Sequence, residues 1–450
     1  MTLRKRKTLF FLFVLAFFVI SSYMLAYAQG YRIGLSWPPS LGQVVQRTGM
    51  ILVETDPRGA NLFLDGEIPL SLWERLRSEE VENITTPTRL KNIKPGEYTL
   101  TITLPDYHTW EREITVQPGR ITTITDLQLL KKNLPLRLSA SRVSGDHLSP
   151  DKNWGFDIEN SKLVNLRSGQ TSPIPTTTPE SHIDWSPDSQ RVVIDKKIFE
   201  IEEKSSKIDL KEILGSKIQK PKWRNDRELY YLDQGSLYSF NSKTETSKEL
   251  INTEGRIINH KSLDGYIYLM VERLGKSVLE VYHPLNLEKI RGIDFPLSSG
   301  YEIKGTPRSG LVNVHDNDFQ ILYLLKPLSP IPLKERLDKV EHFDWRGNAV
   351  LVYGNGFEIW EFNLNNHDQK LITRLSDRIE GIIVLPSCKK TVYYNQKQII
   401  IIEKENGKIN ETELASMDHV SDLFVGGQGE DIYFNAQIGS HSGLYKLNIY

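Results

Sequence analysis

A short β pattern recurs along residues 133–450. Its clearest copy runs from His182 to Ile194 and reads as a strand, a polar turn and a second strand, with a third strand at 197–201. Similar turns follow one another at intervals of about 40 residues, which is the chain length that one four-stranded blade of a β-propeller needs. The marker residues of the eight turns are Ser149, Ser186, Arg224, Ser262, Pro307, Arg346, Pro386 and Gly426. The spacing predicts an all-β ring of eight blades. Seven is the alternative, because the step from Ser262 to Pro307 is longer than the others.

The two ends of this region predict how the ring closes. The last unit finishes with a strand at 443–450 and has no fourth strand after it, whereas residues 134–139 form a strand before the first unit's own turn. An unpaired strand edge is a liability that proteins generally cover. We therefore expect strand 134–139 to complete the last blade.

The repeated turn also carries a family resemblance. Trp185-Ser186-Pro187-Asp188 is similar to the Trp-Ser-Pro-Asp-Gly turn of TolB-like, WD-type propeller repeats. The other copies in this chain are degenerate. The resemblance implies a propeller built of such repeats.

The N-terminus carries a membrane signal. Residues 9–28 contain no charged side chain, and a helix of that length rises about 30 Å, enough to cross the hydrocarbon core of a bilayer. Arg4, Lys5, Arg6 and Lys7 precede it within a basic tail, residues 1–8. Positive residues stay on the cytoplasmic side, so we expect a single-pass protein of the cell membrane with its N-terminus in the cytoplasm and the rest outside.

A cleaved secretory signal is the alternative interpretation, since Ala26-Tyr27-Ala28 fits a small-x-small cleavage site. The apolar stretch is long for a signal peptide, which favours an uncleaved anchor. Both interpretations place the remainder outside the cytoplasm. Residues 29–49 are rich in Gly and Pro and are expected to form a linker.

Residues 50–130 alternate between apolar and polar side chains, and turn residues interrupt them. Strands are expected at 51–55, 60–64, 98–104, 114–116 and 121–127, with turns such as Asp65-Gly66 and Pro118-Gly119 between them. Strict alternation with Gly and Pro turns is typical of a small antiparallel sheet or sandwich with one buried face.

This segment resembles the PEGA domain, a small extracytoplasmic β-sandwich. The matching pieces are Pro57-x-Gly59-Ala60, Leu64-Asp65-Gly66, Thr86-Pro87, Pro95-Gly96-Glu97-Tyr98 and Asp106-Tyr107. Asp106 stands where the family usually has glycine, and a longer stretch separates Gly66 from Thr86 than is usual. The resemblance implies a cell-envelope protein and a binding or spacer module without catalysis.

The longer stretch predicts a helical insertion near residues 68–83. Leu72, Trp73, Leu76 and Glu80 would share one helical face. The helix either caps the sandwich or binds a partner through Trp73, because an exposed Trp is a common hot spot of interfaces.

Composition and motifs exclude several classes of function. Lys and Arg number 56 against 57 Asp and Glu, which argues against a nucleic-acid partner. Cys388 is the single cysteine, so an intramolecular disulfide and cysteine-based metal sites are excluded. His441 occupies the central position of Gly439-Ser440-His441-Ser442-Gly443, where a nucleophile elbow needs serine. We expect no cofactor and no metal.

One set of polar residues is a candidate site. These residues stand two positions before the marker turns, on what should be the innermost strands facing the central channel, and they are His147, Asp184, Lys222, His260 and Asp344. They could bind a metal or polar ligand, or they could simply line a solvated channel wall.

We therefore expect a non-enzymatic scaffold at the cell surface that presents the propeller to a protein or a cell-envelope polysaccharide. The alternatives are a propeller hydrolase or lyase, or an enzyme subunit, that uses the channel residues, and a structural spacer with no ligand. Fold alone does not decide among them.

Overall fold

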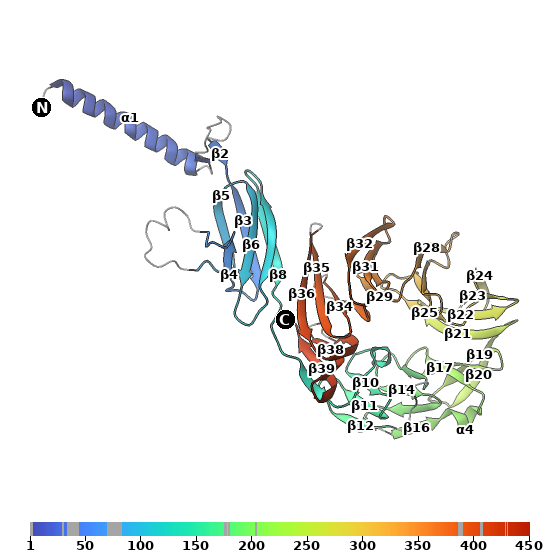
Figure 1. The fold of residues 1–450 in the computed structure, drawn as a ribbon. Helices are drawn as coiled ribbons and strands as arrows, with labels where there is room; N and C mark the ends of the chain where they lie inside the picture. The colour runs from blue at the N-terminus through green and yellow to red at the C-terminus, as the bar shows by residue number, and fades with distance from the viewer. Residues whose placement is uncertain are drawn as a thin grey trace. The chain divides into compact units, whose positions relative to one another are not determined.

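The computed structural model describes residues 3–28, 31–33, 45–69, 83–174, 178, 181–202, 205–385, 390–405, 408–427, 429 and 431–450. The chain divides into two compact units, residues 1–132 and residues 133–449 (Figure 1).

Helix α1 (Leu3–Ala28) opens the first unit, and its segment Arg6–Ala26 is long and apolar enough to span a membrane. Large apolar side chains on it are strongly exposed, among them Leu9 at 62% and Phe13 at 73%. A helix that is apolar on all sides is typical of a protein core or of a membrane span. Two short strands, β1 (Tyr31–Ile33) and β2 (Val45–Arg47), pair with each other after the helix.

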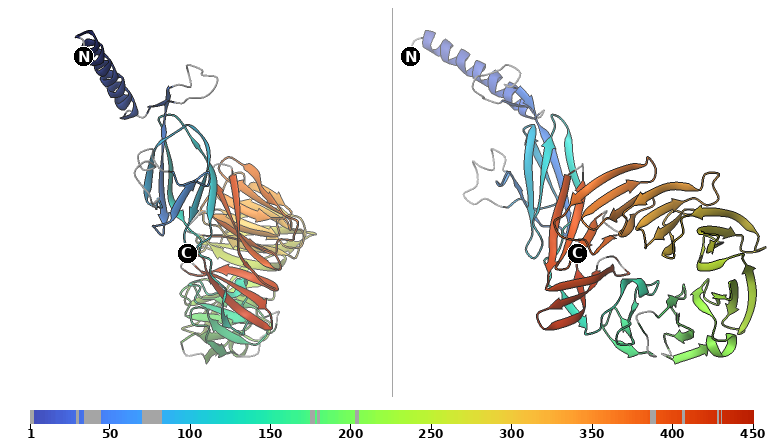
Figure 2. Two further views of the ribbon diagram at one scale, coloured as in Figure 1. Left: turned by 60° about the vertical axis from the view of Figure 1, so that its left-hand side comes forward. Right: turned by 45° about the vertical axis from the view of Figure 1, so that its right-hand side comes forward.

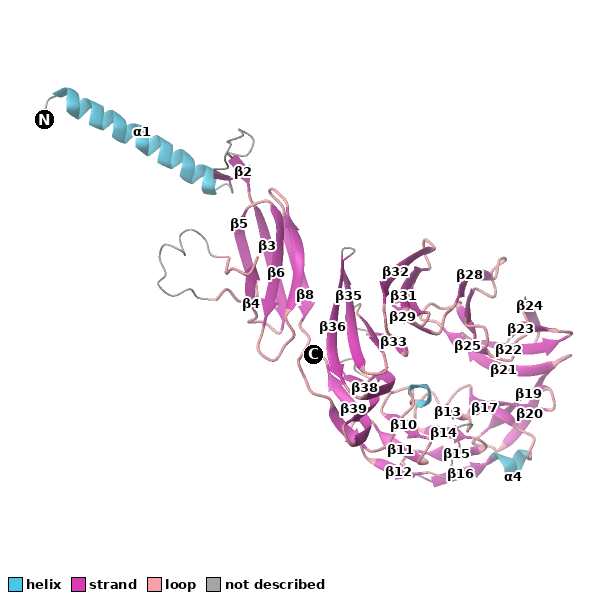
Figure 3. Ribbon diagram, in the orientation of Figure 1, coloured by secondary structure: helices cyan, strands magenta, loops and turns pink. Residues whose placement is uncertain are grey.

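Two three-stranded sheets make up the rest of the first unit (Figure 3). One has the order β5–β3–β8 and the other β4–β6–β7. The strand bounds are β3 (Gly49–Asp56), β4 (Asn61–Leu64), β5 (Thr88–Ile93), β6 (Gly96–Thr103), β7 (Trp110–Val116) and β8 (Ile121–Gln128). Strands β3 and β8 pair in parallel, which differs from the antiparallel sheet expected, because the chain crosses between the two sheets before it returns beside β3.

Alternation determines which side of these strands is buried. Along β7, Trp110, Arg112, Ile114 and Val116 are buried and the residues between them are exposed. The three apolar side chains of this set meet apolar residues of β3 and β4, such as Val53 and Leu62, in one core that both sheets share. The unit is thus a β-sandwich. The expected helix near residues 68–83, with Trp73, lies almost wholly outside the described residues.

The second unit contains eight sheets within its described residues, and we number them in chain order. Seven are antiparallel with four strands, and sheet 1 has three. The bounds of sheets 1 to 4 are β10 (Trp154–Asp157), β11 (Lys162–Asn165) and β12 (Thr171–Pro173); β13 (Ile183–Trp185), β14 (Arg191–Ile194), β15 (Lys197–Glu200) and β16 (Ser205–Asp209); β17 (Gln219–Trp223), β18 (Glu228–Asp233), β19 (Ser236–Asn241) and β20 (Thr246–Asn252); and β21 (Arg256–Leu263), β22 (Tyr266–Arg273), β23 (Lys276–Tyr282) and β24 (Lys289–Phe295). Two short helices, η1 (Gly145–His147) and α4 (Leu210–Leu214), lie before sheet 1 and after sheet 2.

Sheets 5 to 8 continue the pattern. Their bounds are β25 (Tyr301–Gly305), β26 (Val312–Asp316), β27 (Ile321–Leu325) and β28 (Leu333–Asp338); β29 (His342–Arg346), β30 (Val350–Gly354), β31 (Glu358–Asn363) and β32 (Asp368–Arg374); β33 (Gly381–Val384), β34 (Thr391–Tyr394), β35 (Gln398–Glu405) and β36 (Lys408–Ser416); and β37 (His419–Val425), β38 (Asp431–Ile438), β39 (His441–Asn448) and β9 (Leu136–Ser139). Strand β9 comes from the beginning of the unit and pairs antiparallel with β39, Leu136 opposite Lys446.

Buried apolar side chains join each sheet to the next. Phe156 of sheet 1 packs with Trp185 of sheet 2, and Val352 of sheet 6 packs with Tyr393 of sheet 7. Val164 of sheet 1 also shares a core with Tyr433 of sheet 8. The right-hand view of Figure 2 shows the sheets following one another around a centre. This is the arrangement of a β-propeller.

Candidate functional site

The first strands of sheets 2, 3 and 4 carry a cluster of polar side chains. These strands are the inner ones, because β13 lies against β17 and the Lys222 side chain of β17 bonds to Asn259 of β21. Three of the predicted residues meet here, Asp184, Lys222 and His260. We call them, together with their partners, the inner-strand cluster: His182, Asp184, Lys220, Lys222, Asn259, His260 and Lys261.

Asp184 joins sheet 2 to sheet 3. Its Oδ2 accepts a hydrogen bond of 2.6 Å from the backbone N–H of Trp223. Burial raises the pKa of this carboxyl, and the nearby charge of Lys261 opposes that rise. A buried backbone N–H needs an acceptor, and the carboxylate provides it.

Lys222 joins sheet 3 to sheet 4 in the same way. Its Nζ donates to Oδ1 of Asn259 at 2.7 Å and to the carbonyl oxygen of His260 at 3.1 Å. Burial lowers the pKa of Lys222 to about 8, and the charge of Lys261 lowers it as well. Asn259 extends the chain of contacts, because its Nδ2 donates to the carbonyl of Tyr301 in sheet 5.

Both histidines of the cluster are bound to backbone carbonyls. The Nε2 of His182 lies 2.8 Å from the oxygen of Pro221, and the Nε2 of His260 lies 2.8 Å from the oxygen of Lys220. Because a carbonyl only accepts, each ring holds its proton on Nε2. Burial lowers the pKa of His182 to about 4 and that of His260 well below its ordinary value. Both rings are therefore neutral at pH 7.

The other two predicted residues lie apart from the cluster. Oδ2 of Asp344 on β29 accepts a hydrogen bond of 2.7 Å from the N–H of Val384, which joins sheet 6 to sheet 7 as Asp184 joins sheets 2 and 3. Burial raises the pKa of Asp344. His147 lies in helix η1 instead of on a strand, because the inner segment of sheet 1 is irregular. Its carbonyl accepts from Nε1 of Trp185 at 3.2 Å.

The Ser-Pro-Asp turn has a structural role of its own. Oγ of Ser186 donates to Asp188 at 2.6 Å and accepts from the N–H of Arg191 at 2.9 Å. The N–H of Asp188 then donates to Oδ1 of Asp226 in the next sheet at 3.0 Å. The turn residues that suggested a repeat family thus hold a tight turn and connect it to its neighbour.

Sequence reasoning missed four members of the cluster: His182, Lys220, Asn259 and Lys261. His182 stands two residues before Asp184, and side chains two apart share a face of a strand, so period-two counting could have found it. Lys220 and Asn259 lie at register shifts of β17 and β21, where that counting fails.

The cluster offers limited chemistry. Its carboxylate, amide and imidazole groups are each hydrogen-bonded to the backbone or a side chain of an adjoining sheet. Within the described residues, no three His, Cys, Asp or Glu side chains gather in a way that could hold a metal ion. Cys388 and Trp73 fall outside the described residues.

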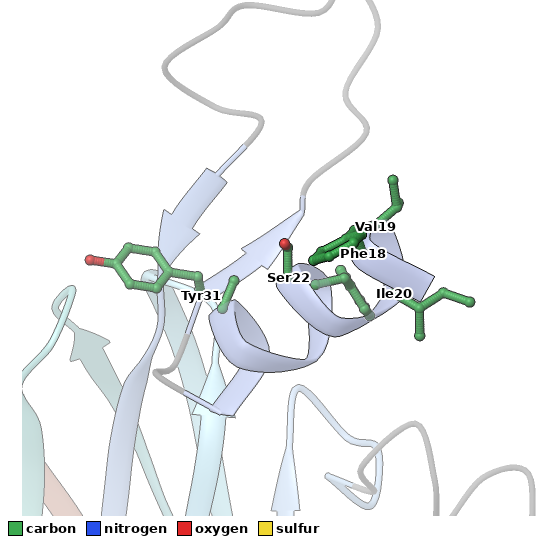
Figure 4. A pocket seen from close by; sticks show the side chains of 7 residues that line it. Phe18, Val19, Ile20, Ser22 and Tyr31 are labelled. Atoms are coloured by element: carbon green, nitrogen blue, oxygen red, sulfur yellow. The ribbon is translucent and has the colours of Figure 1, made fainter. Parts of the chain in front are cut away.

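A hollow of about 620 Å³ lies beside α1, and Figure 4 shows the side chains that line it. It is lined by Phe18, Val19, Ile20, Ser22, Tyr23, Ala26 and Tyr31. All of these except Tyr31 belong to the segment that is long and apolar enough to span a membrane.

Comparisons with known proteins bear on both units. The PEGA domain model matches residues 82–133. A search of curated protein sequences gives no match. Among solved structures, the Dos1 propeller is similar at 11% identity, covering 71% of this chain and 95% of its own, with a TM-score of 0.46. A chain of the mitotic checkpoint complex matches at 12% identity, 69% and 87% coverage and a TM-score of 0.40. Hsv2 of Kluyveromyces lactis matches at 13% identity, 47% and 67% coverage and a TM-score of 0.33.

Proposed function

We propose that this chain is a membrane-anchored, non-enzymatic binding protein of the cell envelope. In this proposal α1 spans the membrane with the N-terminus in the cytoplasm, and the PEGA-like sandwich and a TolB-like, WD-type propeller of eight blades stand outside. Strand β9 closes the ring as the fourth strand of the last blade. The partner is a protein or an envelope polysaccharide.

The observation that carries the proposal is the bonding of the inner-strand cluster. The Asp184 carboxylate receives the N–H of Trp223, and the Lys222 ammonium group bonds to Asn259. A catalytic acid or base needs a proton or a lone pair that is directed at the substrate and is not already used in a hydrogen bond within the protein. Side chains that hold neighbouring sheets together favour a rigid ring whose outer surface does the binding.

Membrane placement is tested in intact cells with a maleimide that does not cross membranes. Lys243 lies in an exposed turn, so the double variant Cys388→Ser/Lys243→Cys carries one accessible thiol in sheet 3. We expect labelling before the cells are permeabilised. Labelling that requires permeabilisation would refute the proposed orientation.

The alternative, a hydrolase or lyase that uses the channel residues, is tested with His147→Ala, Asp184→Asn and His260→Gln. The Asp184→Asn variant keeps an acceptor for the N–H of Trp223, so its fold should survive. We expect the three variants to retain the co-purifying envelope partners of the full chain. A hydrolytic activity on envelope polymers that is present in the wild type and lost in a folded Asp184→Asn variant would favour the enzyme.

A further inference from the structure

A polar hollow of about 480 Å³ lies where the connection from sheet 6 enters sheet 7. Its volume falls within the range of small-ligand sites, about 300–1,000 Å³. The lining comes from the β32–β33 connection, from the turn between β34 and β35, and from the end of β36: Asp377, Arg378, Asn395, Gln396, Lys397, Gln398 and Ser416. All of these residues are described, and none belongs to the inner-strand cluster.

The floor of the hollow is a fixed turn. Oδ1 of Asn395 accepts the backbone N–H groups of Lys397 at 2.9 Å and Gln398 at 2.8 Å. The carbonyls of Gln396 and Lys397 accept N–H groups of Val420 and Met417, both at 2.8 Å. The backbone is therefore held on both sides, while the side chains of Gln396 and Lys397 remain exposed. Such a turn presents side chains to a ligand at a small entropic cost.

The charges around the hollow nearly cancel. Nη2 of Arg378 bonds to Oε2 of Glu341 at 2.6 Å, so this cation is already paired. Nε2 of Gln398 donates to Oε2 of Glu413 at 2.7 Å. Within the lining, Lys397 and Asp377 then remain as one exposed positive and one exposed negative group, and the exposed Glu413 beside Gln398 adds one further negative charge. No excess of positive charge is left to select an anion.

The exposed groups instead offer every type of hydrogen-bonding partner. Lys397 only donates, the carboxylate of Asp377 only accepts, and Gln396 and Ser416 do both. A hydroxyl group also donates and accepts, so a ligand with several hydroxyls can use all four side chains.

We propose that this hollow binds a neutral, polyhydroxylated ligand, namely one saccharide unit of a glycan. The inference deepens the proposed function and rests on it, because it names the class of partner that the propeller would meet outside the membrane.

The test uses the full chain in lipid nanodiscs and titration calorimetry. The probes are neutral tetrasaccharides of glucose, mannose, galactose and N-acetylglucosamine, with tetragalacturonic acid and inorganic phosphate as anionic probes. We expect at least one neutral probe to bind at concentrations up to about 10 mM, the range of weak single-site affinities. Gln396→Ala, Lys397→Ala and Asp377→Ala should each weaken that binding about fivefold, the loss that one hydrogen bond accounts for.

A matched control comes from sheet 3. Oδ1 of Asn241 accepts the N–H groups of Lys243 and Thr244, the same turn that Asn395 makes with Lys397 and Gln398. Lys243→Ala should therefore leave binding unchanged. Failure of all four neutral probes, tighter binding of the anionic probes, or equal affinities in the three variants would overturn the proposal. If sugar binding fails while Lys243→Cys is still labelled outside the cell, the hollow is refuted and the proposed membrane orientation stands.

Discussion

The ammonium group of Lys222 in sheet 3 donates a 2.7 Å hydrogen bond to Oδ1 of Asn259 in sheet 4. The same group reaches the carbonyl of His260, so one side chain joins two inner strands. Contacts of this type recur from sheet to sheet, from Asp184 to Trp223 and from Asp344 to Val384. The inner strands are thereby held together by polar groups as well as by the apolar cores between sheets.

Lys222 predicts a dependence of stability on alkaline pH. Its pKa is about 8 in the folded protein and 10.5 as an ordinary value, so the unfolded chain holds the proton more tightly. Folding is penalised while the group is protonated, and stability should rise as the pH increases from 8 towards 10.5. The resulting gain in the free energy of unfolding is up to about 3 kcal/mol. Urea unfolding of the wild type and of Lys222→Met at pH 7.5, 8.5 and 9.5 measures it.

The difference between the two proteins is the decisive quantity, since groups distant from Lys222 titrate equally in both. The wild type should gain stability over this interval relative to Lys222→Met. Parallel pH profiles of the two proteins would contradict the prediction.

His182 predicts a dependence of the same sign at acid pH. Burial lowers its pKa to about 4, whereas the unfolded side chain titrates near 6.5. The stability present above pH 6.5 is therefore lost as the pH falls from 6.5 to 4, by up to about 3 kcal/mol. His182→Gln removes the titration and keeps an amide that can donate to Pro221. Thermal unfolding between pH 7 and 4.5 should show a shallower decline for the variant, and an unchanged decline would exclude His182 as a source of acid sensitivity.

The sequence predicted the sheet pattern better than the bonding between sheets. Period-two alternation and turn residues are local properties, so the strands around Trp185 and Tyr433 could be placed from the residues themselves. The partner of Asp184 could not, because the N–H of Trp223 reaches it only through packing of the next sheet. His147 left the expected pattern since its segment forms a 3-10 helix. The polar hollow combines three segments distant in sequence, and no spacing rule joins Asp377 to Ser416.

The Asp184 contact predicts a difference between two substitutions. Asp184→Ala leaves the N–H of the buried Trp223 without its acceptor, which should cost about 1–3 kcal/mol. Asp184→Asn keeps a side-chain oxygen and should cost less. Asp344→Ala and Asp344→Asn should repeat this order, because Val384 is bound in the same way. The denaturant midpoints of the four variants test this order at both positions. Equal midpoints for the Ala and Asn variants would show that accepting the backbone N–H does not contribute to stability.

Ring closure by β9 is tested at Gly443. This glycine has φ +149°, and a Cβ built on it would lie 2.1 Å from the carbonyl oxygen of Ser139 in β9. Gly443→Ala should therefore force β9 away from β39 and lower the free energy of unfolding by more than about 2 kcal/mol. Gly439 is the matched control, since its φ is +58° and a Cβ there meets nothing within 4 Å, so Gly439→Ala should cost only about 1 kcal/mol. Faster proteolytic cleavage near residues 133–139 should accompany the loss in Gly443→Ala alone. Equal stability and equal cleavage in the two variants would mean that β9 does not hold the last sheet.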